Sequence, residues 1–446
     1  MSLPAAIISV LAHFQPAFTR PTYHKAVVLL VGTLLTRGRH TIAAALRHMG
    51  LQHTTDWARY HHVFNRSTWS AFTVSRILLK LLVTTFIKTG ATVDLVIDET
   101  LERRWGRKLT RRGQWRDSLL SSKRQNVTNS GLRWVVMALV VSVPWTHQRW
   151  ALPFLSVLAT TPEVSQQLKK RHKTVPRLAQ QMVKVVRRWL PQVPITLMGD
   201  LAYSVIDLGT VCQHARVALI APLRLDARLF APPPTTRAAT GRPRIVGQRL
   251  PDLSAVLTDP HTVWDQVTIA WYGGTSRTFE LATSTALWYS TGLAPLCIRW
   301  VLVRDPRGTL TSRAFFCTDP CRPAASVVAD FVKRWCIEVT FEESRAYLGL
   351  ETQRQWSDKA VERSTPAMLG VFSLTTLLGS TLFPDGHIPV ATAAWYRKRH
   401  ATFGDVLAAV RQAVWNNFSF QTSPSNPDMV LVPRAELSRL VYAVCY

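Results

Sequence analysis

The first 90 residues carry apolar side chains at spacings of three and four, which is the period of an amphipathic helix. Segments 23–35, 41–49 and 69–86 follow this pattern, with Arg and Lys side chains between the apolar positions. The pattern predicts a helical N-terminal region. It is equally consistent with a DNA-binding or dimerising domain and with a helical layer that supports the rest of the fold.

The hydrophobic pattern changes after residue 90. Short apolar runs rich in Val, Ile and Leu replace the helical period, and runs of this kind are typical of buried strands. A long amphipathic and basic segment, 162–190, separates them and predicts a helix that ends at Pro191. Strands that alternate with helices indicate an α/β layer architecture. The predicted strands are 92–98, 134–142, 195–200 and 217–221.

A third pattern begins at residue 222. A loop rich in Pro and Arg is followed by strand-like runs rich in Trp, Thr and Val, and we interpret residues 222–322 as a β-rich insertion. One helix is predicted over 324–348, and most of the remainder is helical. The predicted division is a helical N-terminal region (1–90), the first part of an α/β core (91–221), the insertion (222–322), a core helix segment (323–365) and a helical C-terminal region (366–446).

Net charge is the most informative bulk property of the chain. The chain has 54 Lys and Arg against 27 Asp and Glu, a formal net charge of +27. Such an excess favours a polyanionic partner, because each neutralised phosphate releases counterions. Charge alone favours nucleic acid over a basic protein of another kind and does not distinguish DNA from RNA.

Cysteine spacing and apolar run length bear on the environment of the protein. The six cysteines lack the paired spacing of a structural zinc site. Apolar runs such as 26–35 are about half as long as a bilayer requires. We therefore expect a cytoplasmic protein, associated with the nucleoid when bound to DNA, with no membrane partner.

Three carboxylates stand out in a chain poor in acidic residues. Asp98 and Asp200 each end a predicted strand, and Glu338 lies within the predicted helix 324–348. Carboxylates at strand ends and on a covering helix can converge at one sheet edge, where hard oxygen ligands suit Mg²⁺ or Mn²⁺. A single Asp at a strand end more often caps a turn. Spacing does not exclude three neighbouring acidic residues as rivals: Asp94, Glu99 and Glu102.

The helix around Glu338 supplies a second pattern. Phe331, Arg334, Glu338 and Arg345 stand at offsets of 0, 3, 7 and 14, which place them on one face of a continuous helix. A carboxylate flanked by guanidinium groups suits a metal ion and a phosphate backbone. The alternative is an ordinary helix surface with salt bridges.

These four positions carry a resemblance to a known family. The chain resembles the DDE transposases of bacterial insertion sequences, of the insertion sequence 701 type related to the insertion sequence 4 group, over about residues 20 to 380. The signature of that group is Tyr, two residues, Arg, three residues, Glu, six residues, Lys. This chain has Phe331 in place of the Tyr and Arg345 in place of the Lys. Segments 96–100 and 197–203 resemble the first and second catalytic segments of the family.

The resemblance implies a fold, an activity and a set of partners. The implied fold is a ribonuclease-H-like catalytic core interrupted by a β-rich insertion, with helical N- and C-terminal regions. Asp98, Asp200 and Glu338 would be the catalytic and metal-binding residues, holding two Mg²⁺ or Mn²⁺ ions. The implied reaction is cleavage at the ends of an element and strand transfer into target DNA, by a homodimer on double-stranded DNA. Phe331, Arg334 and Arg345 would contact DNA.

Two further features have weaker support. Arg242 and Arg244 lie in an extended basic segment that could enter a minor groove, and a flexible loop is an equal alternative. Tryptophans of the insertion, Trp264, Trp271, Trp288 and Trp300, belong to the core or stack on an unpaired base. The competing functions are a ribonuclease-H-like DNA nuclease without strand transfer and a catalytically silent DNA-binding derivative.

Overall fold

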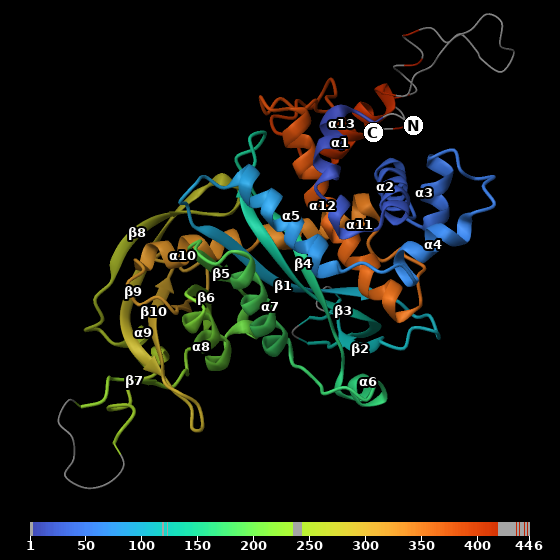
Figure 1. The fold of residues 1–446 in the computed structure, drawn as a ribbon. Coiled ribbons are helices and arrows are strands. Elements are labelled where there is room, and N and C mark those ends of the chain that lie inside the picture. The colour runs from blue at the N-terminus through green and yellow to red at the C-terminus, as the bar shows by residue number, and fades with distance from the viewer. Residues whose placement is uncertain are drawn as a thin grey trace, which may run out of the picture.

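A single mixed sheet of eleven strands organises the computed structural model (Figure 1). The structure describes residues 3–117, 120–122, 124–234 and 243–417, with four separate positions (434, 437, 441 and 444) near the C-terminus. The strands are β1 (Val93–Arg103), β2 (Gly113–Arg116), β3 (Thr128–Ser142), β4 (Arg149–Ala159), β5 (Ile195–Met198), β6 (Val217–Leu223), β7 (Leu229–Phe230), β8 (Asp265–Ala270), β9 (Ser276–Trp288), β10 (Leu296–Arg304) and β11 (Arg313–Cys317).

Five of these strands form the core of the sheet. Their spatial order is β4, β3, β1, β5, β6. β3 is antiparallel to both β1 and β4, while β5 and β6 run parallel to β1. In chain order this is the arrangement 3-2-1-4-5 of a ribonuclease-H-like core, and the predicted fold class is confirmed.

The β-rich insertion continues the same sheet. β11 pairs antiparallel with the outer edge of β6, and β10 and β9 follow it outward. β7 and β8 both pair with β9. The sheet therefore extends from the core strands into the insertion without a break, and this continuity fixes the position of the insertion relative to the core.

Helices cover both faces of the sheet (Figure 1). Along β1, Leu95 and Ile97 point to a large core that includes α5, α7, α8 and α12. Val96, between them, points to a second core formed with α10 and α11. The helices are α1 (Ala5–Ala12), α2 (Arg20–Leu35), α3 (Ile42–His48), α4 (Trp57–Asn65), α5 (Ala71–Phe86), α6 (Pro162–Gln167), α7 (Val175–Trp189), α8 (Ile206–His214), α9 (Leu253–Thr258), α10 (Ala324–Lys333), α11 (Cys336–Leu348), α12 (Asp358–Leu382) and α13 (Phe403–Asn416).

Two helices predicted as continuous are each interrupted. The predicted helix 162–190 divides into α6 and α7, and Lys169 between them has a positive φ of 52°, which a helix cannot contain. The predicted helix 324–348 divides into α10 and α11 at Arg334 and Trp335. There the amides of Arg334 and Glu338 each bond to the carbonyl three residues earlier, so a short 3₁₀ segment replaces the α-helical pattern.

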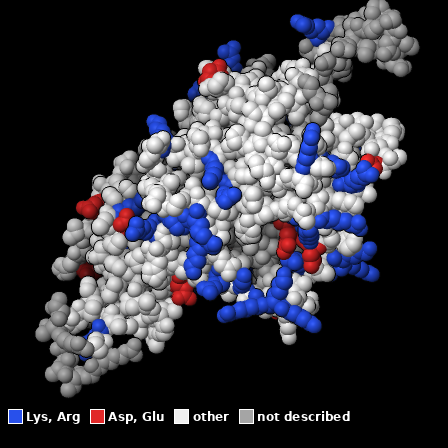
Figure 2. Space-filling view, viewed as in Figure 1, with Lys and Arg blue, Asp and Glu red and all other residues white. Residues whose placement is uncertain are grey.

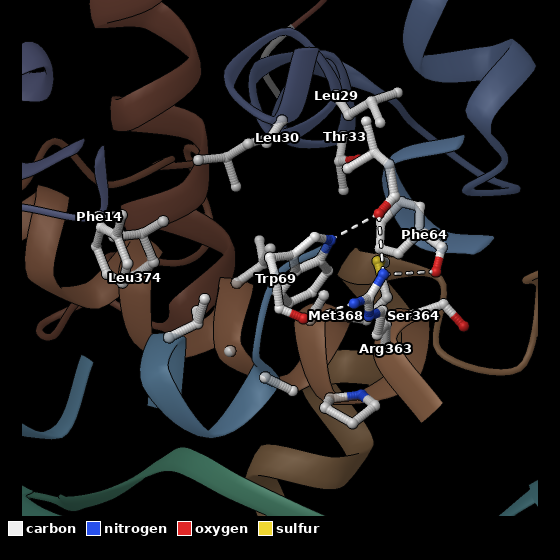
Figure 3. A pocket seen from close by; sticks show the side chains of 18 of the residues that line it. Phe14, Leu29, Leu30, Thr33, Phe64, Trp69, Arg363, Ser364, Met368 and Leu374 are labelled. Carbon is white, nitrogen blue, oxygen red and sulfur yellow. Dashed lines mark hydrogen bonds between the residues drawn. The ribbon is translucent and has the colours of Figure 1, made fainter. Parts of the chain in front are cut away.

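The N-terminal helices surround an apolar cavity of about 210 Å³ that they share with α12 (Figure 3). Beside it, Arg363 of α12 donates to the carbonyls of Phe64 at 3.1 Å and Ser67 at 2.8 Å, and also to that of Trp69. Its guanidinium lies 4.3 Å from the ring centre of Trp69. Because α4 ends at Asn65, Arg363 satisfies carbonyl groups that the end of this helix leaves unpaired.

One described helix, α12, is long and apolar enough to cross a membrane by length and composition. In its most apolar window, 61% of the helix is buried inside the protein. Its contacts with β4, α13 and the N-terminal helices are those of a central core helix.

Candidate active site

One face of β1 carries polar side chains that meet the helices after the insertion. Successive residues of a strand point to opposite faces. Asp98 and Thr100 therefore share the face of Val96, opposite Leu95 and Ile97. Asp98 pairs with Arg334, at the start of the segment that leads into α11. Thr100, two residues further along β1, accepts a hydrogen bond at 2.6 Å from Arg345, near the end of α11.

The guanidinium of Arg334 joins two of the predicted carboxylates. It donates through Nη1 to Asp98 Oδ2 at 2.6 Å and through Nη2 to Glu338 Oε1 at 2.6 Å. Asp98 and Arg334 are mostly buried, with side-chain exposures of 16% and 14%, whereas that of Glu338 is 37%. These two ion pairs of Arg334 connect β1 to the start of α11, and Glu338 is the carboxylate that faces solvent.

Asp200 reaches the same place through the register of two parallel strands. Val96 of β1 pairs with Met198 of β5, so Asp98 and Asp200 each follow a paired position by two residues. Asp200 Oδ1 accepts from the amide of Ala202 at 2.9 Å, which caps a short 3₁₀ turn, Leu201–Tyr203. The turn fixes the side chain at the carboxyl end of β5, beside Asp98.

The pKa of Asp98 shows that the three carboxylates act on one another. Burial raises the pKa of Asp98 to about 7; Arg334 opposes this shift, and Asp200 and Glu338 add to it. The structure therefore brings the three predicted carboxylates into one electrostatic cluster, with Arg334 as its central cation.

The donor set of this cluster fits a divalent cation. Carboxylate oxygens are the ligands that Mg²⁺ and Mn²⁺ prefer, and the guanidinium of Arg334 shows that Asp98 and Glu338 can share a positive charge. Within the described ranges, no three His, Cys, Asp or Glu side chains are already spaced to hold a metal ion. Asp98, Asp200 and Glu338 are the residues that would hold one here.

The three rival carboxylates belong to other ion pairs. Asp94 accepts from Lys333 at 2.7 Å, and Glu99 pairs with Arg133. Glu102 is completely buried, where it accepts from Trp134 Nε1 at 2.9 Å, Thr365 at 2.7 Å and Arg104 at 3.1 Å. Asp94 and Glu102 are therefore held by structural contacts, while Glu99 keeps one buried oxygen without a hydrogen-bond partner. Asp98 is the acidic residue of β1 that binds Arg334 together with Glu338.

The four signature positions lie on both sides of the turn between α10 and α11. Phe331 is 8% exposed and packs on Phe315 with ring centres 4.6 Å apart, so it lies in the core and offers no surface to DNA. Arg345 bonds Glu351 at 2.8 Å as well as Thr100. Arg334 nevertheless bonds both Asp98 and Glu338, and Arg345 bonds Thr100 on the same face of β1, so these three side chains stay on one side of the interrupted helix.

The predicted basic arm is only partly described. Arg244 is exposed, and Arg242 lies outside the described residues. Among the insertion tryptophans, Trp300 is 9% exposed and Trp288 packs on Phe316. Trp271 packs on Phe279, and the guanidinium of Arg304 covers the ring of Trp264 at 4.0 Å.

Sequence reasoning missed an aromatic pair beside Arg334. Trp335, directly after Arg334, is 50% exposed, and Tyr272 of the insertion is 39% exposed. Their ring centres are 5.8 Å apart in an edge-on arrangement. The position of Trp335 next to the signature Arg was the available signal, but its contact with Tyr272 depends on the pairing of β8 with β9.

Comparison with known proteins gives a family match and a distant structural likeness. Residues 13–278, more than half of the chain, match the family model described as "DDE superfamily endonuclease". This range contains Asp98 and Asp200 and ends before Glu338. No curated protein matches significantly. The structure is similar to a piggyBac transposase in a synaptic complex with hairpin DNA, with a TM-score of 0.42, 9% identity, and coverage of 98% of this chain and 80% of that chain.

Proposed function

The chain belongs to the DDE superfamily of endonucleases, and on this premise we propose that it is a cut-and-paste DNA transposase. In this proposal it cleaves at the ends of a mobile element and joins the exposed 3′-hydroxyl to target DNA. The subtype is the insertion sequence 701 type that its signature residues resemble. The substrate is double-stranded DNA, and the active form is a homodimer on paired element ends.

The observation that carries the proposal is the Arg334 bridge between Asp98 and Glu338, with Asp200 beside it. These groups come from β1, α11 and the end of β5, and structural contacts hold the neighbouring Asp94 and Glu102. A cluster of like charges costs free energy unless cations neutralise it. The sequence retains all three carboxylates, which favours an active enzyme over a silent derivative.

Asp98, Asp200 and Glu338 would hold the divalent ions on which endonucleases of this superfamily generally depend. When bound, two such ions activate the attacking oxygen and stabilise the leaving one. The residues of the chain supply position and charge. Asp98 is fixed by the sheet register, and Asp200 by its capped turn. Arg334 holds the start of α11 against β1 and neutralises charge that the carboxylates share.

The surface is suited to a phosphate backbone. Figure 2 shows Lys and Arg side chains scattered over the visible face and gathered across its middle and lower right, with fewer Asp and Glu. Contacts of this kind make binding strongly dependent on salt. We expect the affinity for duplex DNA to fall steeply as salt rises, and a flat response would contradict a phosphate-binding surface.

Substitution of the three carboxylates tests the proposal. We expect Asp98→Asn, Asp200→Asn and Glu338→Gln each to abolish metal-dependent cleavage of duplex DNA that carries the element end, while duplex affinity stays near that of the unchanged protein. Asp265→Asn, at an exposed carboxylate on β8, is the matched control and should cleave normally. Normal cleavage by any one of the three variants would remove that residue from the site.

A second assay separates the transposase from a nuclease without strand transfer. The protein is given pre-cleaved element ends that carry a free 3′-hydroxyl, together with supercoiled target DNA. A transposase joins them, and the joined product appears on a gel. Cleavage of intact ends without joining of pre-cleaved ones would favour the nuclease.

A further inference from the structure

An aromatic and basic turn lies between α12 and α13. The backbones of Ala393 and Tyr396 exchange two hydrogen bonds of 3.1 Å, which leave Ala394 and Trp395 at the tip of a closed turn. The indole of Trp395 is 90% exposed and Tyr396 is 62% exposed. Four basic residues follow directly, Arg397, Lys398, Arg399 and His400, and we refer to residues 395–400 as the WYRKRH tip.

Folding stability does not explain this exposed indole. A Trp that stays 90% exposed buries almost no apolar area, so it gains little from the hydrophobic effect. Large exposed aromatic side chains favour aggregation, and a surface without a binding role does better without them. Arg397 and Arg399 are exposed, and no ion pair joins either of them to another described residue.

The base of the tip is held firmly. Lys398 donates to Thr402 at 2.9 Å and pairs with the buried Asp405, which completes the capping box of α13. The ring of His400 lies edge-on to that of His147 in the loop between β3 and β4, with centres 4.9 Å apart. A rigid base presents the indole at a low cost in conformational entropy, which favours binding.

The segment that follows the tip packs on α11, where the rings of Tyr347 and Phe403 lie 6.3 Å apart. Lys398 and Asp405 both act on Glu343 of α11, whose pKa burial raises to about 7. Glu343 is five residues beyond Glu338, which places the two side chains on different faces of α11.

We propose that the WYRKRH tip binds duplex DNA, with Trp395 wedged against a base step and Arg397 and Arg399 on the flanking phosphates. Apolar side chains inserted at base steps unstack them and bend the duplex. An aromatic ring stacks on any base, so this contact needs no particular sequence. The inference rests on the proposed function for the nature of the partner, and on the local geometry for the site.

The test measures duplex affinity in the cleavage-deficient Asp98→Asn protein. A fluorescein-labelled duplex of mixed sequence is titrated, and anisotropy gives the dissociation constant. We expect Trp395→Ala to weaken binding about tenfold, within the range of stacking contributions, and Trp395→Phe to retain most of the affinity. Phe72→Ala, which removes another exposed aromatic ring on α5, is the control and should bind normally.

Two further measurements distinguish a wedge from a simple charge contact. A duplex with 2-aminopurine at successive steps should brighten at one step when the unchanged protein binds, and this signal should disappear with Trp395→Ala. The double substitution Arg397→Ala and Arg399→Ala should reduce the slope of log affinity against log salt by about two. Loss of affinity without any change in 2-aminopurine fluorescence would overturn the wedge.

Other occupants of the tip give different results. Unchanged duplex affinity with altered sedimentation of Trp395→Ala would assign the tip to contact with a second copy of the chain, and would overturn the proposal. Trp395-dependent binding to vesicles of anionic lipid, without an effect on DNA, would overturn it as well. If Trp395-dependent duplex binding is found but the protein with all three carboxylates never cleaves DNA, the proposed function fails and the inference about the tip stands.

Discussion

Two largely buried arginines on neighbouring helices bind opposite kinds of partner. Arg334 lies between Asp98 and Glu338, two carboxylates from different elements. Arg363 donates to backbone carbonyls at the end of α4 and covers the ring of Trp69. Burial lowers the pKa of both groups, but for Arg334 the charges of Asp98 and Glu338 outweigh burial and raise the pKa above its usual value.

This difference indicates which of the two guanidinium groups a metal ion could displace. Carbonyl groups carry no net charge, and four of them around a planar guanidinium leave little reason for another cation to replace it. Carboxylates bind metal ions readily, and Arg334 must share Asp98 and Glu338 with any ion that enters the site. We therefore expect Arg363 to matter for folding and Arg334 for the reaction.

The largest expected effect is on stability, at Arg363. Arg363→Met leaves buried carbonyls without donors, and we expect a loss of about 4 kcal/mol in the free energy of unfolding. Urea denaturation measures it, and cleavage per folded molecule should be unchanged. Arg188→Met, at an exposed position on α7, is the control and should change stability by less than about 0.5 kcal/mol. A loss at Arg363 no greater than at Arg188 would refute the structural role.

Arg334 should show the reverse behaviour. Arg334→Ala removes the cation between the two carboxylates, and we expect the single-turnover cleavage rate to fall about a hundredfold, as when one preorganised donor is lost. For Arg334→Lys we expect a cleavage rate between that of Arg334→Ala and that of the unchanged protein, because an ammonium keeps the charge but cannot donate along two fixed directions. The Mn²⁺ concentration required for half-maximal cleavage should also change. A rate loss that merely follows the unfolded fraction would make Arg334 equivalent to Arg363.

The pH dependence of cleavage follows from the environment of Asp98. Burial raises the pKa of Asp98 to about 7, so this carboxyl is protonated at lower pH and cannot bind a cation there. As pH falls through 7, cleavage at limiting Mg²⁺ should drop about tenfold per pH unit, and above 7 it should level off. Saturating Mg²⁺ should shift the midpoint to lower pH. A rate that is flat across this range at every Mg²⁺ concentration would contradict the prediction.

The fold and the position of the carboxylates could be predicted because their signals are local. The alternation along β1 decides that Asp98 shares a face with Val96, and the end of the apolar run 195–200 places Asp200 at a strand end. The helices α2, α3 and α5 follow from apolar periodicity in the same way. These features depend on nearest neighbours in the sequence, which a single chain displays.

The parts that could not be predicted depend on tertiary contacts. No residue between Ala324 and Leu348 is a helix breaker, so the 3₁₀ turn at Arg334 has no sequence signal. Arg363 and Arg187 count toward the net charge of the chain, but both donate to carbonyls at the ends of other elements. Part of the positive charge that favours nucleic acid is therefore used inside the fold. The edge-on contact of Trp335 with Tyr272 likewise requires the insertion strands to be in place.

The smallest expected effect is a change in stability at the cavity beside Arg363, which can accept an added methyl group. Gly370 of α12 lines this cavity, and an added Cβ would meet Leu78 at 3.6 Å, an ordinary contact. Gly370→Ala should raise the free energy of unfolding by about 1 kcal/mol, because Ala favours the helix. Gly32→Ala is the matched control: its Cβ would lie 2.4 Å from the carbonyl oxygen of Ala45, so it should destabilise. Cleavage by the folded Gly370→Ala protein should be unaffected, since no part of the cavity belongs to the carboxylate cluster; a changed rate would show that the region around Arg363 is coupled to the reaction after all.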